Sequence, residues 1–278
     1  MRHISAFAAL AFAGSAFGQI GLVDFDGTEL GLTGYSNPSY TYSGSGFGTN
    51  ASLVTPGTAT STWVAGDSFW PMSRGNVGPN NIGMPFGISD DSVAPAAGNS
   101  LFANDTLGFA GTTLGNNGFF GVMDILNPAN SAPISASFTF NIAGFSNLSV
   151  SIDFIAMGDY EATNDDAYNF EYSIDGGLFQ PLFTSSIDEN LSQNYTMDIG
   201  TVVNLGDPLF INSVMINDVY QTLTASVLGT GNSLTIRFTA SGDADGMGFD
   251  NLRVDGVPTP GAAVLMGVAG VVGFRRRR

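Results

Sequence analysis

The chain has 278 residues, with 24 acidic side chains against eight arginines and no lysine, and its formal net charge is −16. It has no cysteine, and its one histidine is His3. The lack of cysteine excludes disulfides and thiolate chemistry, and the lack of lysine excludes Schiff-base lysines. Beyond His3, the chain can form neither a histidine-containing catalytic triad nor a histidine-ligated zinc site. The negative charge disfavours nucleic acid as a partner, because the phosphates would be repelled.

Residues 1–18 predict a secretory signal peptide. Met1 to His3 form a short basic start, residues 6–17 are almost wholly apolar, and small residues precede a cleavage position near Gly18. The alternative is a buried helix of the fold, which the segment does not favour because it lacks a polar face. From Gln19 to Gly256, three arginines oppose all 24 carboxylates, a net charge of −21 for the exported part.

Residues 31–131 are rich in Gly, Asn, Ser and Pro. A structureless loop of this length is not expected in a compact domain, so short strands of one sandwich are predicted, with a separate small domain as the alternative. The only two tryptophans, Trp63 and Trp70, lie close together in this segment. Aromatic faces beside polar side chains can stack on sugar rings, which makes both candidate ligand-binding residues. Packing in the core is the alternative interpretation.

The second half of the chain alternates apolar and polar residues with a period of two, which is typical of strands buried on one face. Asp175-Gly176-Gly177 follows one such stretch as a predicted hairpin turn. Many short strands separated by Gly, Asn and Asp predict an all-β fold, an antiparallel β-sandwich over residues 19–256. The alternating stretches are 133–142, 148–154, 168–174 and 234–238, and further strands are expected in 201–219 and 221–228.

Four stretches resemble a jelly-roll module found in exported bacterial proteins. They are Leu22–Gly27, Ala156–Glu161, Tyr172–Gly177 and Gly248–Val254, and they extend over most of residues 19–256. The resemblance implies that the sandwich is a jelly roll. It also implies a structural calcium ion, because acidic residues on the first and last strands often hold one in related carbohydrate-binding jelly rolls.

Asp250 is the centre of the predicted calcium site. It has the same parity as Leu252 and Val254, so it is predicted to point into the core with them. A buried carboxylate requires a cation or several hydrogen bonds, and calcium binds about six to eight oxygen atoms. The alternative is that Asp250 caps backbone N–H groups at the mouth of a strand. The candidate ligands are Asp24, Asp26, Asp159, Glu161 and Asp250.

Residues 257–278 form a predicted sorting signal. Val257-Pro258-Thr259-Pro260 precedes an uncharged stretch from Gly261 to Phe274 and the cluster Arg275, Arg276, Arg277 and Arg278. The uncharged stretch would form a helix of about 21 Å, shorter than a lipid core of roughly 30 Å, and the arginines would stay on the cytoplasmic side.

This tail resembles the PEP-CTERM signal of bacteria, a segment also called the ice-binding protein C-terminal domain. Threonine replaces the glutamate of the Val-Pro-Glu-Pro consensus at Thr259. The resemblance implies transient membrane anchoring, a membrane sorting protease (exosortase) as a partner, and transfer to the cell surface or matrix. The resemblance implies a destination and says nothing about activity.

These observations predict a non-catalytic structural or adhesive protein that is secreted or displayed at the cell surface. One alternative is a calcium-dependent carbohydrate-binding module, whose partner would be extracellular polysaccharide. Another is a glycoside hydrolase, which would need two carboxylates about 5 to 10 Å apart. No local motif selects such a pair among the 24 acidic residues.

Overall fold

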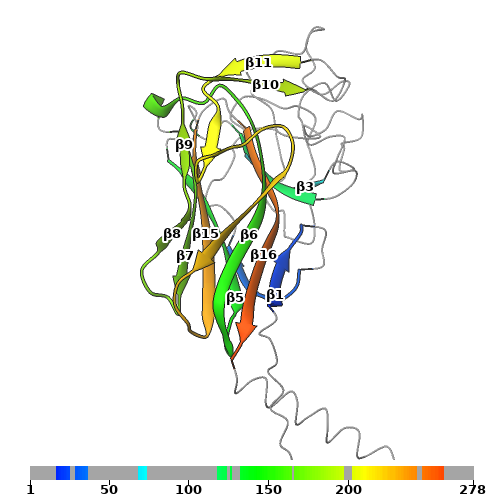
Figure 1. The fold of residues 1–278 in the computed structure, drawn as a ribbon, viewed down its shortest axis with the longest axis vertical. Helices are drawn as coiled ribbons and strands as arrows, with labels where there is room; N and C mark the ends of the chain where they lie inside the picture. Colours follow the sequence, from blue (N-terminus) through cyan, green and yellow to red (C-terminus); the bar gives the residue numbers. More distant parts are fainter. Residues whose placement is uncertain are drawn as a thin grey trace, which may run out of the picture.

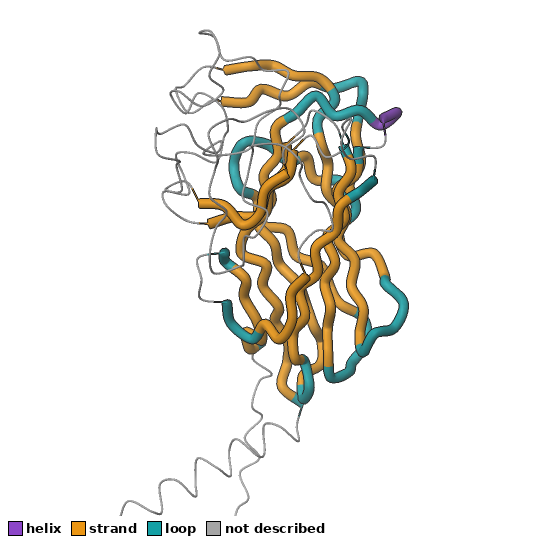
Figure 2. The backbone as a smooth tube through the Cα atoms, turned by 180° about the vertical axis from the view of Figure 1, so that it is seen from behind, coloured by secondary structure: helices purple, strands orange, loops and turns teal. Residues whose placement is uncertain are grey.

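The computed structural model describes residues 17–25, 29–36, 68–73, 118–123, 126, 132–164, 166–196, 202–242 and 246–259. Antiparallel strands make up most of these ranges, and the one helical element among them is the 3-10 turn Ala162–Asn164 (Figure 2). The predicted antiparallel β-sandwich is confirmed. The helices predicted for the signal peptide and for residues 261–274 lie outside the described residues. Within the described ranges, no helix is long and apolar enough to cross a membrane.

One of the two main sheets, sheet A, contains the two longest strands. These are β6 (Phe145–Met157) and β16 (Gly246–Pro258), which run side by side along the long axis of the molecule (Figure 1). The strand order is β14-β6-β16-β4-β3, and β1 pairs with the part of β16 that β4 leaves free. The remaining bounds in sheet A are β1 Gly18–Val23, β3 Ser68–Ser73, β4 Gly118–Met123 and β14 Gln221–Val227.

The other main sheet, sheet B, has the order β2-β5-β15-β7-β8. Its bounds are β2 Leu32–Ser36, β5 Ile134–Asn141, β7 Ala167–Ile174, β8 Gln180–Phe183 and β15 Ser233–Ser241. Two small sheets complete the described fold. They comprise β10 (Ser192–Thr196) with β11 (Val202–Gly206), and β9 (Ser185–Ile187) with β12 (Leu209–Ile211) and β13 (Val214–Met215).

The two main sheets pack through a core rich in phenylalanine. Phe249 of sheet A lies 5.0 Å from Phe170 and 5.1 Å from Phe238, both of sheet B, measured between ring centroids. Phe249 also stacks on Phe120 of β4 at 4.8 Å. Aromatic pairs of this kind contribute about 0.5–1.5 kcal/mol beyond the apolar area that they bury. Nearly all the apolar residues of the predicted period-two stripes lie in this core, as expected.

The predicted hairpin turn is confirmed. Asp175 and Gly176 have φ values of 51° and 73°, and the Gly177 N–H donates to the Ile174 carbonyl at 2.9 Å. Two central residues with positive φ define a type I′ turn, whose twist matches that of the flanking strands. Glycine is favoured in this conformation because it has no Cβ.

Three described strands lie within residues 31–131, where the sequence alone left the domain assignment open. β2 pairs with β5 of sheet B, and β4 pairs with β16 of sheet A. β3 pairs with β4 in turn. These strands therefore add to the two main sheets.

Candidate functional site

The outer face of sheet B presents polar side chains in regular rows. In β5, β15 and β7 the residues that alternate with core residues point away from the sandwich. The strand register aligns them in three rows, which are Ser135–Thr239–Asn169, Ser137–Arg237–Glu171 and Thr139–Thr235–Ser173. Neighbouring strands lie about 4.8 Å apart, so each row spans about 10 Å of a rigid surface.

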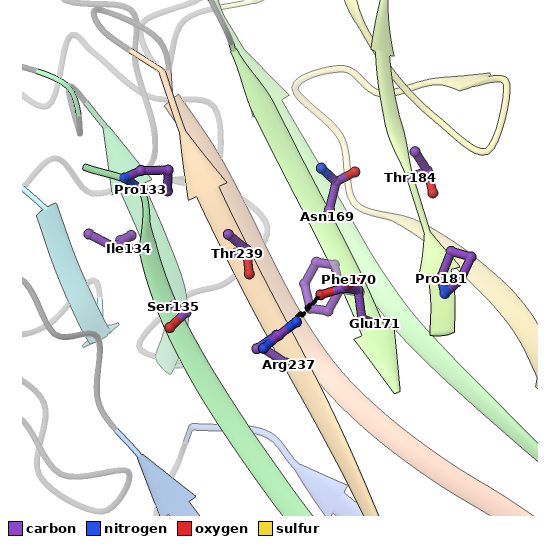
Figure 3. A pocket seen from close by; sticks show the side chains of 10 residues that line it. All are labelled: Pro133, Ile134, Ser135, Asn169, Phe170, Glu171, Pro181, Thr184, Arg237 and Thr239. Atoms are coloured by element: carbon purple, nitrogen blue, oxygen red, sulfur yellow. Dashed lines mark hydrogen bonds and ion pairs between the residues drawn. The ribbon is translucent and has the colours of Figure 1, made fainter. Parts of the chain in front are cut away.

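A groove of about 560 Å³, which we call groove B, lies over two of these rows. Figure 3 shows Arg237, Thr239, Asn169 and Glu171 on its floor, while Phe170 belongs to the core beneath. Pro133 and Pro181 bound it at the strand edges, and Ser135 and Thr184 complete its polar lining.

Arg237 and Glu171 form an ion pair at the centre of groove B. The Arg237 Nη2 and Nε atoms donate to Glu171 Oε2 at 2.6 and 3.1 Å. The Phe179 ring lies 3.7 Å from the guanidinium carbon, measured to the ring centroid. The two side chains keep 35% and 31% of their surface exposed. The guanidinium is thus fixed from two sides while the pair stays accessible.

Several polar atoms of groove B have no hydrogen-bond partner within the described part of the chain. The Asn169 carboxamide oxygen accepts from the Ser185 N–H at 3.0 Å, which leaves its NH₂ group available. Glu171 Oε1, Arg237 Nη1 and the hydroxyls of Ser135 and Thr239 are available as well. The groove therefore offers donors and acceptors a few ångströms apart, which is the arrangement that binds a hydroxyl-rich molecule.

The predicted calcium ligands are distributed over different parts of the described fold. Asp250 pairs with Asp153 in mid-strand, whereas Asp159 follows the end of β6, whose last residue, Met157, lies about 13 Å along the strand from Asp153. The Asp159 carboxylate lies against the backbone of Gly206, and the Glu161 N–H donates to Asp166 at 2.8 Å. Asp24 follows β1, and Asp26 lies outside the described residues.

In the ranges that the structure describes, no three acidic or histidine side chains form a group suited to a metal ion. The described candidates thus give no fit for calcium, and the calcium site stays a prediction.

Asp250 is buried, as predicted, but the predicted direction of its side chain is wrong. Phe249 belongs to the core together with Leu252 and Val254, so Asp250 lies on the outer face of sheet A beside Asp153. The cause is a β-bulge between Asp250 and Arg253, where Asn251 has a φ of 51°. A bulge inserts one extra residue and reverses the parity of everything before it.

Acidic side chains also meet at the end of the sandwich that carries β10 and β11 (Figure 1). Partial burial raises the pKa of Asp207, and the nearby charges of Asp159, Glu189 and Asp188 raise it further. Close carboxylates disfavour one another's ionised forms, so this end of the molecule is a site of electrostatic repulsion.

Neither tryptophan contributes to groove B as the structure describes it. Trp63 lies outside the described residues, and Trp70 lies in β3, where only the backbone is described. Their predicted role in stacking on sugars therefore stays a prediction.

The predicted sorting motif begins inside the sandwich. Val257 and Pro258 are the last residues of β16 and pair with Ser146 and Phe145. The Thr259 N–H donates to the Gly144 carbonyl at 2.8 Å. β16 thus extends two residues past Gly256, the expected end of the domain, whereas Pro260 and Arg275–Arg278 lie outside the described residues.

The residues of groove B were not predicted as a site. Glu171 and Arg237 are 66 positions apart, and the register of β7 with β15 brings them together. One signal was present in the sequence: Arg237 is one of only three arginines between residues 19 and 256, and it lies at a polar position of an alternating strand.

Comparisons with known proteins do not assign this chain to a family. No family model matches the chain, and no curated protein matches it. Similar solved structures include a CBM4 protein, at 14% identity and a TM-score of 0.28, over 51% of this chain and 70% of that chain. A family 30 carbohydrate binding module matches at 10% identity and a TM-score of 0.27, over 70% of this chain and 87% of that chain.

The CBM22-1–GH10 modules of a xylanase from Clostridium thermocellum match at 9% identity and a TM-score of 0.26, over 51% of this chain and 22% of that chain. Similarity at this level carries no conclusion about this chain.

Proposed function

We propose that this chain is a non-catalytic module that binds neutral polysaccharide in groove B. One observation carries the proposal: donors and acceptors that have no partner among the described residues line up on three adjacent strands around the fixed Arg237–Glu171 pair. Side chains held on paired strands lose little conformational entropy when a ligand binds, so each hydrogen bond contributes more to affinity.

The chemistry of groove B favours hydroxyl groups over ions. A sugar hydroxyl both donates and accepts, so one ring can bridge the Asn169 NH₂ group and Glu171 Oε1. The guanidinium and the carboxylate of the central pair compensate each other, so neither sign of charge is favoured locally. The net charge of −21 between residues 19 and 256 repels polyanions from the whole surface.

A binding role is preferred to glycoside hydrolysis because the described lining of groove B contains too few carboxylates. Hydrolysis generally needs two carboxylates flanking the scissile bond. Among the described residues that line groove B there is one carboxylate, Glu171, and Arg237 contacts it directly. No histidine or lysine is available between residues 19 and 256 to act in place of the second.

The proposed place of action is outside the cytoplasm. It is supported by the signal-like residues 1–18 and by the apolar stretch and arginine cluster of residues 261–278. The absence of lysine and the high acidic content suit a surface that must remain soluble in a polymer matrix. A matrix polysaccharide is then the natural ligand class, and a membrane sorting protease is the proposed processing partner.

Affinity electrophoresis and calorimetry of the purified chain test the proposal with soluble β-1,4-xylan and mixed-linked β-1,3-1,4-glucan. Glu171→Gln and Thr239→Val remove groups of groove B and should each weaken binding at this groove by about 5- to 10-fold, the effect of one hydrogen bond of about 1–1.5 kcal/mol.

Thr235→Val is the matched control, because Thr235 lies four residues from Thr239 on the same face of β15, outside the groove. Equal binding by all three variants and the unmodified chain would place the ligand elsewhere. Absence of binding to both polysaccharides would contradict the proposed function.

A further inference from the structure

The outer face of sheet A carries a groove of about 330 Å³, which we call groove A. It is built on the same plan as groove B, from polar residues that share one face of four adjacent strands. The register of β1, β16, β6 and β14 aligns three rows, which are Asp250–Asp153–Thr222, Leu22–Arg253–Ser151–Thr224 and Gln19–Asp255–Ser149–Ser226. Leu22, Arg253 and Ser151 of the middle row line the groove, together with Asp153 and Thr222 of the first row and Gln19 of the third.

The charged centre of groove A repeats that of groove B with different residues. Arg253 Nη2 and Nε contact the two carboxylate oxygens of Asp255 at 2.8 and 2.7 Å. The Arg253 side chain is 48% exposed, and that of Asp255 is 12% exposed. The Nη1 atom of Arg253 thus remains available to a ligand in groove A, which the exposed side chain of Gln19 also lines.

Asn251 connects the bulge to groove A. Its NH₂ group donates to Asp153 Oδ2 at 2.8 Å, and the Thr222 hydroxyl donates to Asp153 Oδ1. These contacts fix Asp153 and leave the side-chain oxygen of Asn251, Oδ1, without a partner in the described part of the chain. The groove therefore presents an acceptor at Asn251 and donors at Arg253 and Gln19, with Leu22 as an apolar contact between them.

The placement of arginine is the second observation that distinguishes both grooves from the rest of the acidic surface. Residues 19–256 contain three arginines against 24 carboxylates. Two of the three lie at the centres of the two grooves, each in contact with a carboxylate. In a surface this acidic, a central guanidinium creates a locally balanced patch where a neutral ligand can bind without facing unopposed carboxylates.

We propose that groove A is a second polysaccharide-binding site, so that one chain crosslinks two polysaccharide strands, one on each face of the sandwich. This inference rests on the proposed function of groove B. Sheets A and B lie back to back about 10 Å apart with their outer faces pointing in opposite directions. A short oligosaccharide cannot contact both faces at once, whereas two long chains can be held together.

Binding stoichiometry tests the inference directly. Calorimetry of the purified chain with xylohexaose and with a mixed-linked β-1,3-1,4-glucohexaose should give two sites per chain for at least one of the two. Asn251→Gly removes the amide and keeps the left-handed backbone, and it should weaken one of the two sites by about 10-fold. Glu171→Gln should weaken the other site and leave the first unchanged.

Crosslinking is tested by turbidity and rheology of long-chain xylan and mixed-linked glucan mixed with the protein. The unmodified chain should raise the viscosity or precipitate the polymer. Asn251→Gly and Glu171→Gln, each of which weakens one groove, should still bind the polymer but raise its viscosity at least five-fold less. Thr222→Val is a second variant for groove A, and Ser226→Ala on the same face of the same strand, outside the groove lining, is its control.

The outcomes separate the two proposals. One hexasaccharide per chain, weakened by Glu171→Gln alone, would retain groove B and overturn the second site. Crosslinking by the Asn251→Gly variant at the level of the unmodified chain would overturn it as well. A chain that binds neither polymer overturns the proposed function and this inference together.

Discussion

The outer faces of sheets A and B show two ways of building a polar surface on a β-sandwich. On sheet B the alternation of β5, β15 and β7 runs without interruption, and the rows follow from period two alone. On sheet A the bulge at Asn251 shifts β16 by one residue, and the row of Asp250 and Asp153 exists only because of that shift. The polar rows of sheet B thus depend on no single residue, whereas the row of Asp250 and Asp153 depends on the conformation of Asn251.

The first prediction concerns the bulge at Asn251 in sheet A. Asn251→Val places a β-branched residue at a φ of 51°, which asparagine and glycine tolerate and valine does not. We expect the free energy of unfolding to fall by about 2–3 kcal/mol, measured by urea denaturation. The same change to valine at Thr235, in the regular strand β15, should cost less than about 1 kcal/mol.

Asn251→Gly is the control for the first prediction, because glycine keeps the backbone conformation and removes only the side chain. Its cost should be about 1 kcal/mol or less. If Asn251→Val and Asn251→Gly were equally stable, the bulge would not depend on the conformation of this residue.

The second prediction compares the two central ion pairs. Arg253→Met leaves Asp255, which is 12% exposed, without its cation, whereas Arg237→Met leaves Glu171, which is 31% exposed. A carboxylate that solvent reaches poorly loses more when its partner is removed. We expect a cost of about 2 kcal/mol for Arg253→Met and less than about 1 kcal/mol for Arg237→Met, by chemical denaturation.

Asp255→Asn and Glu171→Gln are the matched controls for the second prediction, because they remove the carboxylate in place of the cation. In the Asp255→Asn background, Arg253→Met should cost clearly less than it does alone. An equal cost in both backgrounds would mean that the arginine stabilises the sheet through packing and not through the pair.

The third prediction concerns one tyrosine associated with each main sheet. The hydroxyls of Tyr35 in β2 and Tyr220 before β14 are buried and have no hydrogen-bond partner in the described part of the chain. Burial raises the pKa of both, and the charges of Asp250 and Asp153 raise the pKa of Tyr220 further. Both phenols therefore stay protonated in the folded state at a pH where an unfolded tyrosine ionises.

The sign of the resulting pH dependence follows from linkage. Because the folded pKa lies above the unfolded value of about 10, stability is fully present below pH 10 and is lost as the pH rises above it. Each tyrosine adds up to about 1.4 kcal/mol of lost stability per pH unit in that range. Tyr220→Phe and Tyr35→Phe should each flatten the decline, measured as the urea midpoint between pH 9 and 11.5.

At pH 7 neither phenylalanine variant should be destabilised by more than about 0.5 kcal/mol, because no hydrogen bond is lost. Tyr160→Phe is the contrasting control, since the Tyr160 hydroxyl donates to the Gly246 carbonyl at 2.5 Å in the core. A loss of stability for Tyr220→Phe as large as that for Tyr160→Phe would contradict the unpartnered state of Tyr220.

The same contrast between the faces explains what the sequence could and could not predict. Alternation is a local property, so the stripes that became β5, β6, β7 and β15 and the turn at Asp175 could be predicted from their own residues. Strand register is not local: nothing near Glu171 indicates that Arg237 will lie opposite.

The bulge caused the error at Asp250, because one residue with positive φ reverses parity and asparagine gives only a weak indication of it. The sequence nevertheless contained a usable signal, since arginine is so rare between residues 19 and 256 that each one in a strand indicates a specific contact.

The smallest predicted effects come from the threonines that lie in the two grooves. The Thr222 hydroxyl donates to Asp153, whereas the Thr239 hydroxyl has no partner among the described residues. Thr222→Val should therefore lower the free energy of unfolding by about 1 kcal/mol, and Thr239→Val should leave it within about 0.3 kcal/mol of the unmodified chain. Thermal denaturation at neutral pH measures both.

Thr222→Val and Thr239→Val together separate an effect on stability from an effect on polysaccharide binding, one on each face of the sandwich. If Thr239→Val weakens polysaccharide binding without changing stability, the hydroxyl is held in place for a ligand and not for the fold. Should Thr239→Val destabilise the chain as much as Thr222→Val does, its hydroxyl has an internal role, and groove B loses one of the free groups that support its function. In groove A we expect Thr222→Val to lower stability, because the Thr222 hydroxyl stabilises the fold by holding Asp153 beside Asn251.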